Sequence, residues 1–468
     1  MARFHFIGIG GTAMASLAAL LRAKGHDVQG SDRGVYPPMS DFLRRERIPT
    51  FEGYDEGHLT PDIQAVVVGN AISRGNPELE AVLDRKIQYR SLPEVLRDEF
   101  LWGSRSIVMA GTHGKTTSTA LAAWLLSAAG QDPSMLVGGI AVNVDSSYLF
   151  GGGRDFVIEG DEYDSAFFDK TAKFLKYLPD IAVVGNLEYD HADLYADMEA
   201  LRVAFRRLMT LVPRTGRVIL GADSAEAAGL RPFATCPVET VGLAAGADWR
   251  ATELEPSDRG MTFEVSLRGE PLGHARSPLY GVHNVRNTLA AFAAAHAAGL
   301  SFEQMTGGLA SFKGVKRRLE LRGTVRGVSV IDDFAHHPTA ILETIRAIKA
   351  SYPDRRVWAV FEPRSATSCR RVFQQDFARA FADSGADEVV LASVFRQSVP
   401  ADERLSVDDL VRDLVQTGRR ARHLPSVDDI VRVVAREAGP GDVVVIMSNG
   451  GFGGIYGKLL AALSAGAR

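Results

Sequence analysis

The sequence predicts an α/β protein in three domains: a Rossmann-like domain over 1–104, a central domain over 105–318 with a parallel sheet of the P-loop ATPase type, and a doubly wound α/β domain over 319–468. Short apolar runs alternate with helical stretches along the chain, as in parallel sheets covered by helices. Two glycine-rich turns, at 8–13 and 110–117, each join a strand to a helix. With 468 residues the chain is also too long for a single hydrophobic core, since a domain holds roughly 150 residues.

The composition and charge of the chain limit the classes of function that we expect. Hydrophobic residues make up 46% and charged residues 24% of the chain, which is typical of a folded globular protein. A formal net charge of −4 lacks the basic excess of nucleic-acid-binding surfaces, so we expect no nucleic-acid partner. No apolar run reaches the ~18 residues of a membrane span and no signal-peptide pattern opens the chain, so we expect a cytoplasmic protein without a membrane partner. Cys236 and Cys369 are far apart and predict neither a disulfide framework nor a cysteine zinc cluster.

The first domain opens with an apolar strand at 4–7 that enters the glycine turn 8–13. A helical stretch follows, and the next strand ends at Asp32. This spacing satisfies the dinucleotide fingerprint, in which an acid about 20 residues on holds the ribose hydroxyls. The turn fits an NAD-binding domain, the diphosphate of a nucleotide sugar, or tight packing without a ligand. A dehydrogenase, however, has no need for a second nucleotide loop.

That second loop is the stretch 110–117, AGTHGKTT, preceded by a strand at 106–109 and followed by a helix. Backbone N–H groups of such a loop bind phosphate oxygens, Lys115 adds a positive charge, and the Thr116 hydroxyl can ligate Mg²⁺. Met109 stands where the general pattern has its first glycine. We predict a nucleotide-binding loop; the alternative is a Gly-Lys-Thr with a structural role only.

An acidic cluster follows the next apolar strand, at 155–158. A P-loop site needs a carboxylate for the Mg²⁺ that bridges the phosphates, and Glu159 at the strand end is our choice. Glu162 and Asp164 fit a solvated acidic turn better.

A further strand at 181–184 delivers Asn186, Asp190 and His191 beyond its carboxyl end. Ligands and metals gather at that edge of parallel sheets. We expect His191 either to contact metal or phosphate or to be a structural histidine.

Residues 235–278 contain short alternating runs, which predict antiparallel strands appended to the central sheet. The segment 281–287 then leads into an alanine-rich helix over 288–298. The Asn287 amide could pair with an adenine edge. Alternatively, Asn284 and Asn287 at a helix start could be N-caps.

A basic, glycine-bearing crossing at 313–318 marks the boundary between the central and third domains. An arginine there could reach the γ-phosphate, or the segment could be a solvated linker. A strand at 328–331 then runs into two acids and two histidines within 332–337, a costly set to bury unless the groups are used or hydrated. Further strands follow at 357–361 and 388–393. The last strand of the chain ends in a glycine-rich turn at 448–454, which could hold a carboxylate or phosphate, or no ligand.

Taken in order, these motifs resemble the Mur ligases of peptidoglycan metabolism over essentially the whole chain. The resemblance is carried by 8–11, 111–117, Glu159, 186–191, His283-Asn284-x-x-Asn287, Arg317-Arg318 and 333–338. The loop of that family is the shorter Gly-Thr-x-Gly-Lys-Thr form, so Met109 is no obstacle. Within the family, 36–40, 362–365 and 447–454 look like the branch that uses a peptide acceptor rather than free L-alanine.

The resemblance implies an ATP-dependent amide ligase that works through an acyl phosphate. Its substrates would be UDP-N-acetylmuramate and the murein tripeptide L-alanyl-γ-D-glutamyl-meso-diaminopimelate, and its cofactors ATP and Mg²⁺. The alternative within the family is the ligase that adds L-alanine to the same acceptor. From the residues alone, a dehydrogenase and a nucleotide-gated binding protein also stay open. We expect a monomer or a weak homodimer.

The resemblance also implies roles for individual residues. The catalytic residues would be Lys115, His191, Arg318 and His336. ATP would contact Gly111, Thr112, His113, Gly114, Lys115, Thr116, Thr117, Asn284, Asn287 (adenine), Arg318 (phosphate) and Asp333 (ribose). Mg²⁺ would be held by Thr116, Glu159 and His191. The UDP moiety would lie near Gly10, Gly11, Asp32 and Asn70, and the diaminopimelate carboxylates near Arg364 and Asn449, since an arginine fork suits a carboxylate.

Overall fold

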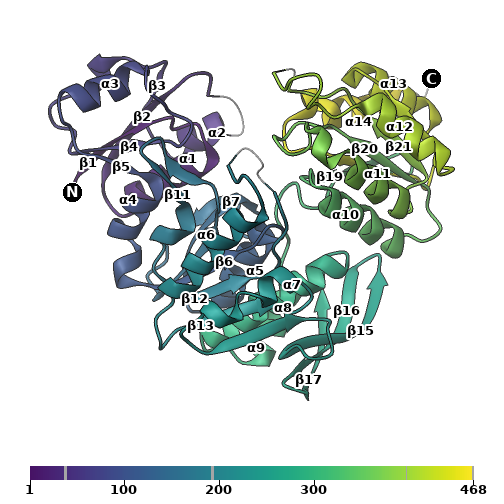
Figure 1. The fold of residues 1–468 in the computed structure, drawn as a ribbon, viewed down its shortest axis with the longest axis horizontal. Coiled ribbons are helices and arrows are strands. Elements are labelled where there is room, and N and C mark those ends of the chain that lie inside the picture. The colour runs from purple at the N-terminus through teal and green to yellow at the C-terminus, as the bar shows by residue number, and fades with distance from the viewer. Residues whose placement is uncertain (36–38, 191–193, 397, 466–468) are drawn as a thin grey trace.

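The computed structural model of the chain describes residues 1–35, 39–190, 194–396 and 398–465, which fold as three α/β units on separate sheets (Figure 1). In this view the first unit, in purple, and the third, in green to yellow, both lie above the teal central unit, one at each side. A small antiparallel hairpin, β10 (Asp164–Ala166) and β11 (Asp169–Ala172), belongs to none of the three sheets.

The first unit is a five-stranded parallel sheet in the order β3-β2-β1-β4-β5, which confirms the predicted Rossmann-like arrangement. Its strands are β1 (Arg3–Ile7), β2 (Asp27–Asp32), β3 (Thr50–Glu52), β4 (Ala65–Val68) and β5 (Tyr89–Ser91). Its helices are α1 (Thr12–Ala23), α2 (Met39–Arg45), α3 (Pro77–Asp84) and α4 (Leu92–Glu99), with short 3₁₀ turns at Glu56–His58 and Leu101–Gly103. The buried side of α1 also joins this unit to the next, because the Ser16 and Ser147 hydroxyls lie 2.6 Å apart.

The central unit is a ten-stranded sheet in the order β17-β16-β15-β14-β13-β12-β6-β9-β7-β8. Its strands are β6 (Arg105–Ala110), β7 (Ser134–Ala141), β8 (Ser146–Leu149), β9 (Asp155–Gly160), β12 (Pro179–Val184), β13 (Arg217–Gly221), β14 (Val238–Gly242), β15 (Trp249–Ser257), β16 (Gly260–Leu267) and β17 (Glu270–Ser277). The neighbouring strands β14, β13, β12, β6, β9 and β7 are parallel. Strands β15, β16 and β17 form the predicted antiparallel appendage. The prediction is wrong for β14, which pairs in parallel with both neighbours.

The helices of this unit are α5 (Lys115–Ala128), α6 (Met198–Leu211), α7 (Ala225–Ala228), α8 (Val282–Ala297) and α9 (Phe302–Ala310), with 3₁₀ turns at Lys173–Lys176 and Arg231–Phe233. Helix α8 begins at Val282, six residues earlier than predicted. Val285, Leu289 and Phe292 are fully buried at helical spacing, so core packing carries the helix back to Gly281.

The early start of α8 changes the interpretation of its two asparagines. Gly281, with φ of +88°, is the N-cap, and no side chain among the described residues caps this helix. Asn284 and Asn287 therefore lie inside the first two turns of α8, and the N-cap alternative is wrong.

The third unit is a six-stranded sheet in the order β18-β19-β23-β20-β21-β22, parallel except for β18. Its strands are β18 (Glu320–Val325), β19 (Val328–Asp333), β20 (Val357–Phe361), β21 (Glu388–Leu391), β22 (Ala421–His423) and β23 (Val443–Met447). One face packs on α10 (Pro338–Ser351), α11 (Gln374–Asp383) and α12 (Val407–Gln416), the other on α13 (Val427–Glu437) and α14 (Ile455–Ala465), with 3₁₀ turns at Arg371–Phe373 and Phe452–Gly454. Two cores, one on each face, confirm the doubly wound prediction.

Among the helices that the structure describes, none is long and apolar enough to cross a membrane.

We expect Phe292→Ala to destabilise the central unit. The side chain is fully buried in the core between α8 and the sheet, so truncation leaves a cavity that costs about 3–5 kcal/mol. Phe150→Ala, the same change at a side chain that is 43% exposed, is the control. Thermal unfolding followed by circular dichroism measures both; an equal drop in midpoint for the two variants would contradict this core assignment.

Candidate active site

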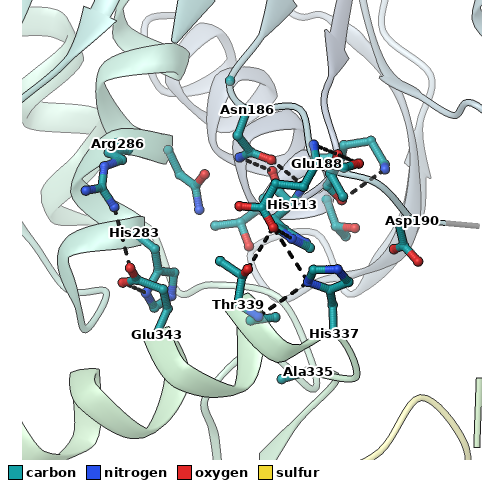
Figure 2. A pocket seen from close by; sticks show the side chains of 18 of the residues that line it. His113, Asn186, Glu188, Asp190, His283, Arg286, Ala335, His337, Thr339 and Glu343 are labelled. Atoms are coloured by element: carbon teal, nitrogen blue, oxygen red, sulfur yellow. Dashed lines mark hydrogen bonds and ion pairs between the residues drawn. The ribbon is translucent and has the colours of Figure 1, made fainter. Parts of the chain in front are cut away.

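The carboxyl ends of the central strands and the start of the third unit enclose a cavity of ≈ 720 Å³ (Figure 2). Its walls come from the β6–α5 loop, the ends of β9 and β12, the first turns of α8, and the segment from β19 into α10. Parallel strands place their functional side chains at this edge. The candidate site is therefore shared by two units.

The β6–α5 loop has the geometry of an anion-binding loop. Gly114 is the N-cap of α5 with φ of +82°, and within the described residues no side chain caps the backbone N–H groups at the start of this helix. A Cβ atom on Gly114 would lie 2.1 Å from Oδ1 of Asn287, so only glycine permits this approach. Asn287 in turn donates to Oδ1 of Asn284 at 3.0 Å. The structure thus brings both asparagines of α8 to the predicted phosphate loop.

Lys115 is buried and held by oxygen atoms. Its Nζ donates to the Gly111 carbonyl at 2.7 Å, the Thr112 carbonyl at 3.3 Å and the Glu162 carboxylate at 2.8 Å. Burial disfavours the charge, yet Glu162 raises the pKa of Lys115 above its usual value. The prediction of a solvated Glu162 is wrong: this side chain is 2% exposed, because it turns inward to neutralise the lysine.

Thr116 and Glu159 form the second part of the site. The Thr116 hydroxyl donates to Glu159 Oε1 at 3.1 Å, and the Gly138 N–H donates to Oε2 at 2.7 Å. Burial raises the pKa of Glu159. Arg318, from the start of the third unit, donates to Thr116 Oγ1 at 3.3 Å, and burial lowers its pKa. An arginine of one unit therefore contacts the loop of another.

Asp333 and His336 line the wall contributed by the third unit. Asp333 accepts from the backbone N–H groups of Leu319 and Ala335 at 2.7 and 2.8 Å, and burial raises its pKa. Burial also lowers the pKa of His336 to about 4. These contacts fix the segment after β19 while its side chains face the cavity.

Glu188 is a cavity residue that sequence reasoning missed. Its carboxylate accepts from the Thr339 hydroxyl at 2.7 Å, lies 3.2 Å from His113 Nε2, and lies 3.6 Å from His337 Nδ1 (Figure 2). Burial opposes ionisation, but the hydrogen bonds from His113 and Thr339 lower the pKa of Glu188 to about 2. Glu188 lies within the stretch 186–191, where Asn186, Asp190 and His191 drew attention instead.

The structure brings together most of the predicted ATP and metal residues. Those that line the cavity are Thr112, His113, Gly114, Lys115, Thr116, Thr117, Glu159, Asn284, Asn287, Arg318, Asp333, His336 and Asn449. Gly111 of the same loop is not among the cavity-lining residues described; a Cβ there would come within 2.8 Å of the Asn186 carbonyl oxygen. His191 and residues 36–38 of the 36–40 motif lie outside the described residues.

The predicted sugar-nucleotide residues form a separate group that does not line this cavity: Gly10, Gly11, Asp32 and Asn70. The Gly10 N–H donates to Asp32 Oδ2 at 2.7 Å, and the Tyr54 hydroxyl donates to Oδ1 at 3.1 Å. The turn and the acid of the fingerprint therefore meet at the carboxyl edge of the first sheet.

Arg364 does not line the cavity, but it lies beside the turn that carries Asn449. Its guanidinium stacks 3.6 Å from the ring centre of Phe395, and a Cβ on Gly450 would lie 2.1 Å from its Nε. The buried Oδ1 of Asn449 has no hydrogen-bond partner within the described parts of the chain. The arginine and this unpaired amide oxygen thus flank one turn.

Comparison with known proteins gives the family. Family profiles match residues 3–100 (Mur ligase family, catalytic domain), 109–295 (Mur ligase middle domain) and 317–450 (Mur ligase, glutamate ligase domain). The chain belongs to the Mur ligase family. The dehydrogenase alternative is therefore wrong, and the Rossmann-like unit is the first part of a Mur ligase.

Three relatives place the chain within the family. It is 41% identical over 463 residues to the UDP-N-acetylmuramate–L-alanyl-γ-D-glutamyl-meso-2,6-diaminoheptandioate ligase of Escherichia coli, covering 99% of this chain and 98% of that one. It is 35% identical to the UDP-N-acetylmuramate–L-alanine ligase of Salinibacter ruber, with coverages of 95% and 92%. The crystal structure of a murein peptide ligase from Psychrobacter arcticus matches with a TM-score of 0.74 and 36% identity, covering 99% of both chains.

We expect the protein to lose stability as the pH falls from 6.5 towards 4. Burial lowers the pKa of His336 from 6.5 to about 4, so in this range the unfolded chain binds a proton that the folded chain excludes. The free energy of unfolding then decreases with falling pH. His336→Gln should flatten the dependence of the thermal midpoint on pH, whereas the exposed His274→Gln should not. Parallel curves for wild type and His336→Gln would refute this assignment.

Proposed function

We propose that this Mur ligase joins UDP-N-acetylmuramate to L-alanyl-γ-D-glutamyl-meso-diaminopimelate in peptidoglycan recycling, with ATP converted to ADP and phosphate. The observation that carries the proposal is the 41% identity, over nearly the full length of both chains, to the ligase of that name. The L-alanine ligase is the second candidate, supported by 35% identity over 95% of the chain.

The residues present fit ATP and Mg²⁺. The uncapped start of α5 and Lys115 suit a polyphosphate, and the oxygens of Thr116 and Glu159 are the hard ligands that Mg²⁺ prefers. We propose that Thr116, Glu159 and His191 hold Mg²⁺ and that Asn284, Asn287 and Asp333 bind the nucleoside. ATP supplies the phosphoryl group that makes the lactyl carboxylate of UDP-N-acetylmuramate an acyl phosphate, and Mg²⁺ neutralises phosphate charge.

The protein's own groups then have defined tasks. Lys115 and the loop N–H groups hold the phosphates, and Arg318 adds positive charge from the third unit. Since an acyl phosphate hydrolyses in water, the walls from both units must exclude solvent until the peptide amine attacks and phosphate leaves. His336, buried and with a lowered pKa, is a neutral imidazole that can hydrogen-bond near the reacting groups.

We propose that each of the three domains binds one of the three substrates. Residues 1–104 bind the UDP-sugar through Gly10, Gly11, Asp32 and Asn70. Residues 105–318 bind ATP. Residues 319–468 bind the peptide, with Arg364 and Asn449 at the diaminopimelate end. The Arg364 guanidinium can donate to a carboxylate, and the unpaired Oδ1 of Asn449 can accept from an N–H group of the peptide.

The decisive assay measures phosphate release from ATP with UDP-N-acetylmuramate present, comparing the tripeptide with L-alanine. Release should depend on the tripeptide. Release with L-alanine alone would assign the chain to the second candidate, and release indifferent to UDP-N-acetylmuramate would leave only nucleotide hydrolysis.

Lys115→Ala should lower turnover by about 10²-fold or more with either acceptor, because it removes a preorganised charge at the phosphates. Lys170→Ala, at an exposed lysine that pairs with Asp164, is the control and should retain turnover. Since Lys115→Ala leaves Glu162 buried without this partner, the thermal midpoint is measured in parallel to separate lost folding from lost catalysis. Normal turnover in folded Lys115→Ala would overturn the role of the loop.

Arg364→Ala should raise KM for the tripeptide by about tenfold or more, the value of one charge-assisted hydrogen bond, and change KM for ATP little. Arg355→Ala, at an exposed arginine of the same unit, should change neither. Steady-state kinetics with each substrate varied in turn gives both constants. An equal rise in the two KM values would count against a peptide-binding role for Arg364.

A further inference from the structure

The cavity contains a second cluster of ligand-type side chains, none of which the proposed reaction uses as a metal ligand. His113 comes from the β6–α5 loop, Glu188 from the segment after β12, and His337 from the N-cap of α10 (Figure 2). One ligand atom from each residue lies within 4.8 Å of the other two. We infer that these three side chains form a site for a divalent transition-metal ion of the Zn²⁺ or Co²⁺ type, distinct from the proposed Mg²⁺ site.

The donor set supports this choice of ion. Two imidazoles and one carboxylate are ligands that suit Zn²⁺ and Co²⁺, whereas Mg²⁺ prefers oxygen ligands and keeps several waters. The Mg²⁺ site proposed above uses the oxygens of Thr116 and Glu159 together with His191. The two sites therefore share no residue, and oxygen donors predominate in the Mg²⁺ site whereas imidazoles predominate in this cluster.

The spacing of the ligand atoms also fits. Bonds of about 2.0–2.2 Å in a tetrahedron place neighbouring ligand atoms roughly 3.3–3.6 Å apart. Glu188 Oε2 lies 3.2 Å from His113 Nε2 and 3.6 Å from His337 Nδ1. An ion can be accommodated by small side-chain movements, with the fourth position open to the cavity.

The ligands are oriented by partners outside the cluster. The Thr339 hydroxyl donates to the Glu188 carboxylate at 2.7 Å, and the Glu188 N–H donates to the Thr112 hydroxyl at 2.9 Å. The His113 N–H donates to Asn186 Oδ1 at 2.8 Å. Hydrogen bonds of this kind hold the ligands of metal sites in place. His337 Nδ1 also accepts from the Thr339 N–H at 3.3 Å, a long bond that an ion would replace.

The position of the cluster means that a bound ion would link two units of the protein. His113 and Glu188 belong to the central unit and His337 to the third, so an ion would tie the phosphate loop to α10 across the cavity. The three side chains are 22%, 37% and 8% exposed, which leaves the cluster accessible from the cavity. A bound ion should therefore stabilise the contact between the two units.

The test uses the full chain, stripped with EDTA and free of nucleotide. Addition of Co²⁺ should produce visible d–d absorption bands of a low-coordinate site and raise the thermal midpoint, since the ion binds the folded form. Glu188→Gln and His337→Asn should each weaken Co²⁺ binding by at least about tenfold, and so should Thr339→Val, which alters only the partner of Glu188. His283→Asn is the control, because His283 faces the same cavity and pairs with Glu343 instead.

Excess Mg²⁺ should not displace Co²⁺. Absence of the bands, bands that millimolar Mg²⁺ removes, or equal binding by wild type and Thr339→Val would overturn the proposal and leave the cluster as a hydrogen-bonded contact between units. Neither readout requires turnover, so failure of the tripeptide assay and failure of this inference are separate results.

Discussion

The contact of Arg318 with the Thr116 hydroxyl joins two units that fold around separate cores. One partner begins the third unit and the other stands at the first turn of α5, so the phosphate loop is complete only when both units are in place. Glu188 repeats the arrangement, since its carboxylate is shared between His113 of the loop and Thr339 of α10. The cavity depends on these interactions between units.

Buried charge explains why the site is arranged this way. Lys115, Glu159 and Arg318 each lose hydration, which would be costly for isolated ions. Glu162 neutralises Lys115, and the Gly138 N–H and the Thr116 hydroxyl satisfy Glu159. The charges that a polyphosphate and a divalent ion would meet are thus already oriented.

The first unit is connected to this edge through its leading helix. Helix α1 begins next to the turn of Gly10 and Gly11 and packs on β7 and β8 of the central sheet. Strand β7 in turn carries Gly138, whose N–H holds Glu159. Helix α1 and strand β7 therefore form a packed connection. The predicted sugar-nucleotide turn lies at one end of it and Glu159, the predicted metal ligand, at the other.

Local patterns in the sequence were sufficient for the strands that lead into the motifs, the two glycine turns and the class of each unit, because strand–turn–helix signals depend on neighbouring residues. The same patterns placed Glu159 and Thr116 together, since parallel strands share one carboxyl edge. They failed for the start of α8, where core contacts of Val285 and Leu289 extend the helix, and for β14.

Only the tertiary structure decided which distant residues meet. Glu162 is buried because Lys115 lies opposite it, although its acidic neighbours resemble a solvated turn. Glu188, Thr339 and His337 converge from segments about 150 residues apart, a distance that loop and strand signals cannot span. Sequence by itself determined the chemistry available at each strand end, and packing of the units determined how those ends combine into one site.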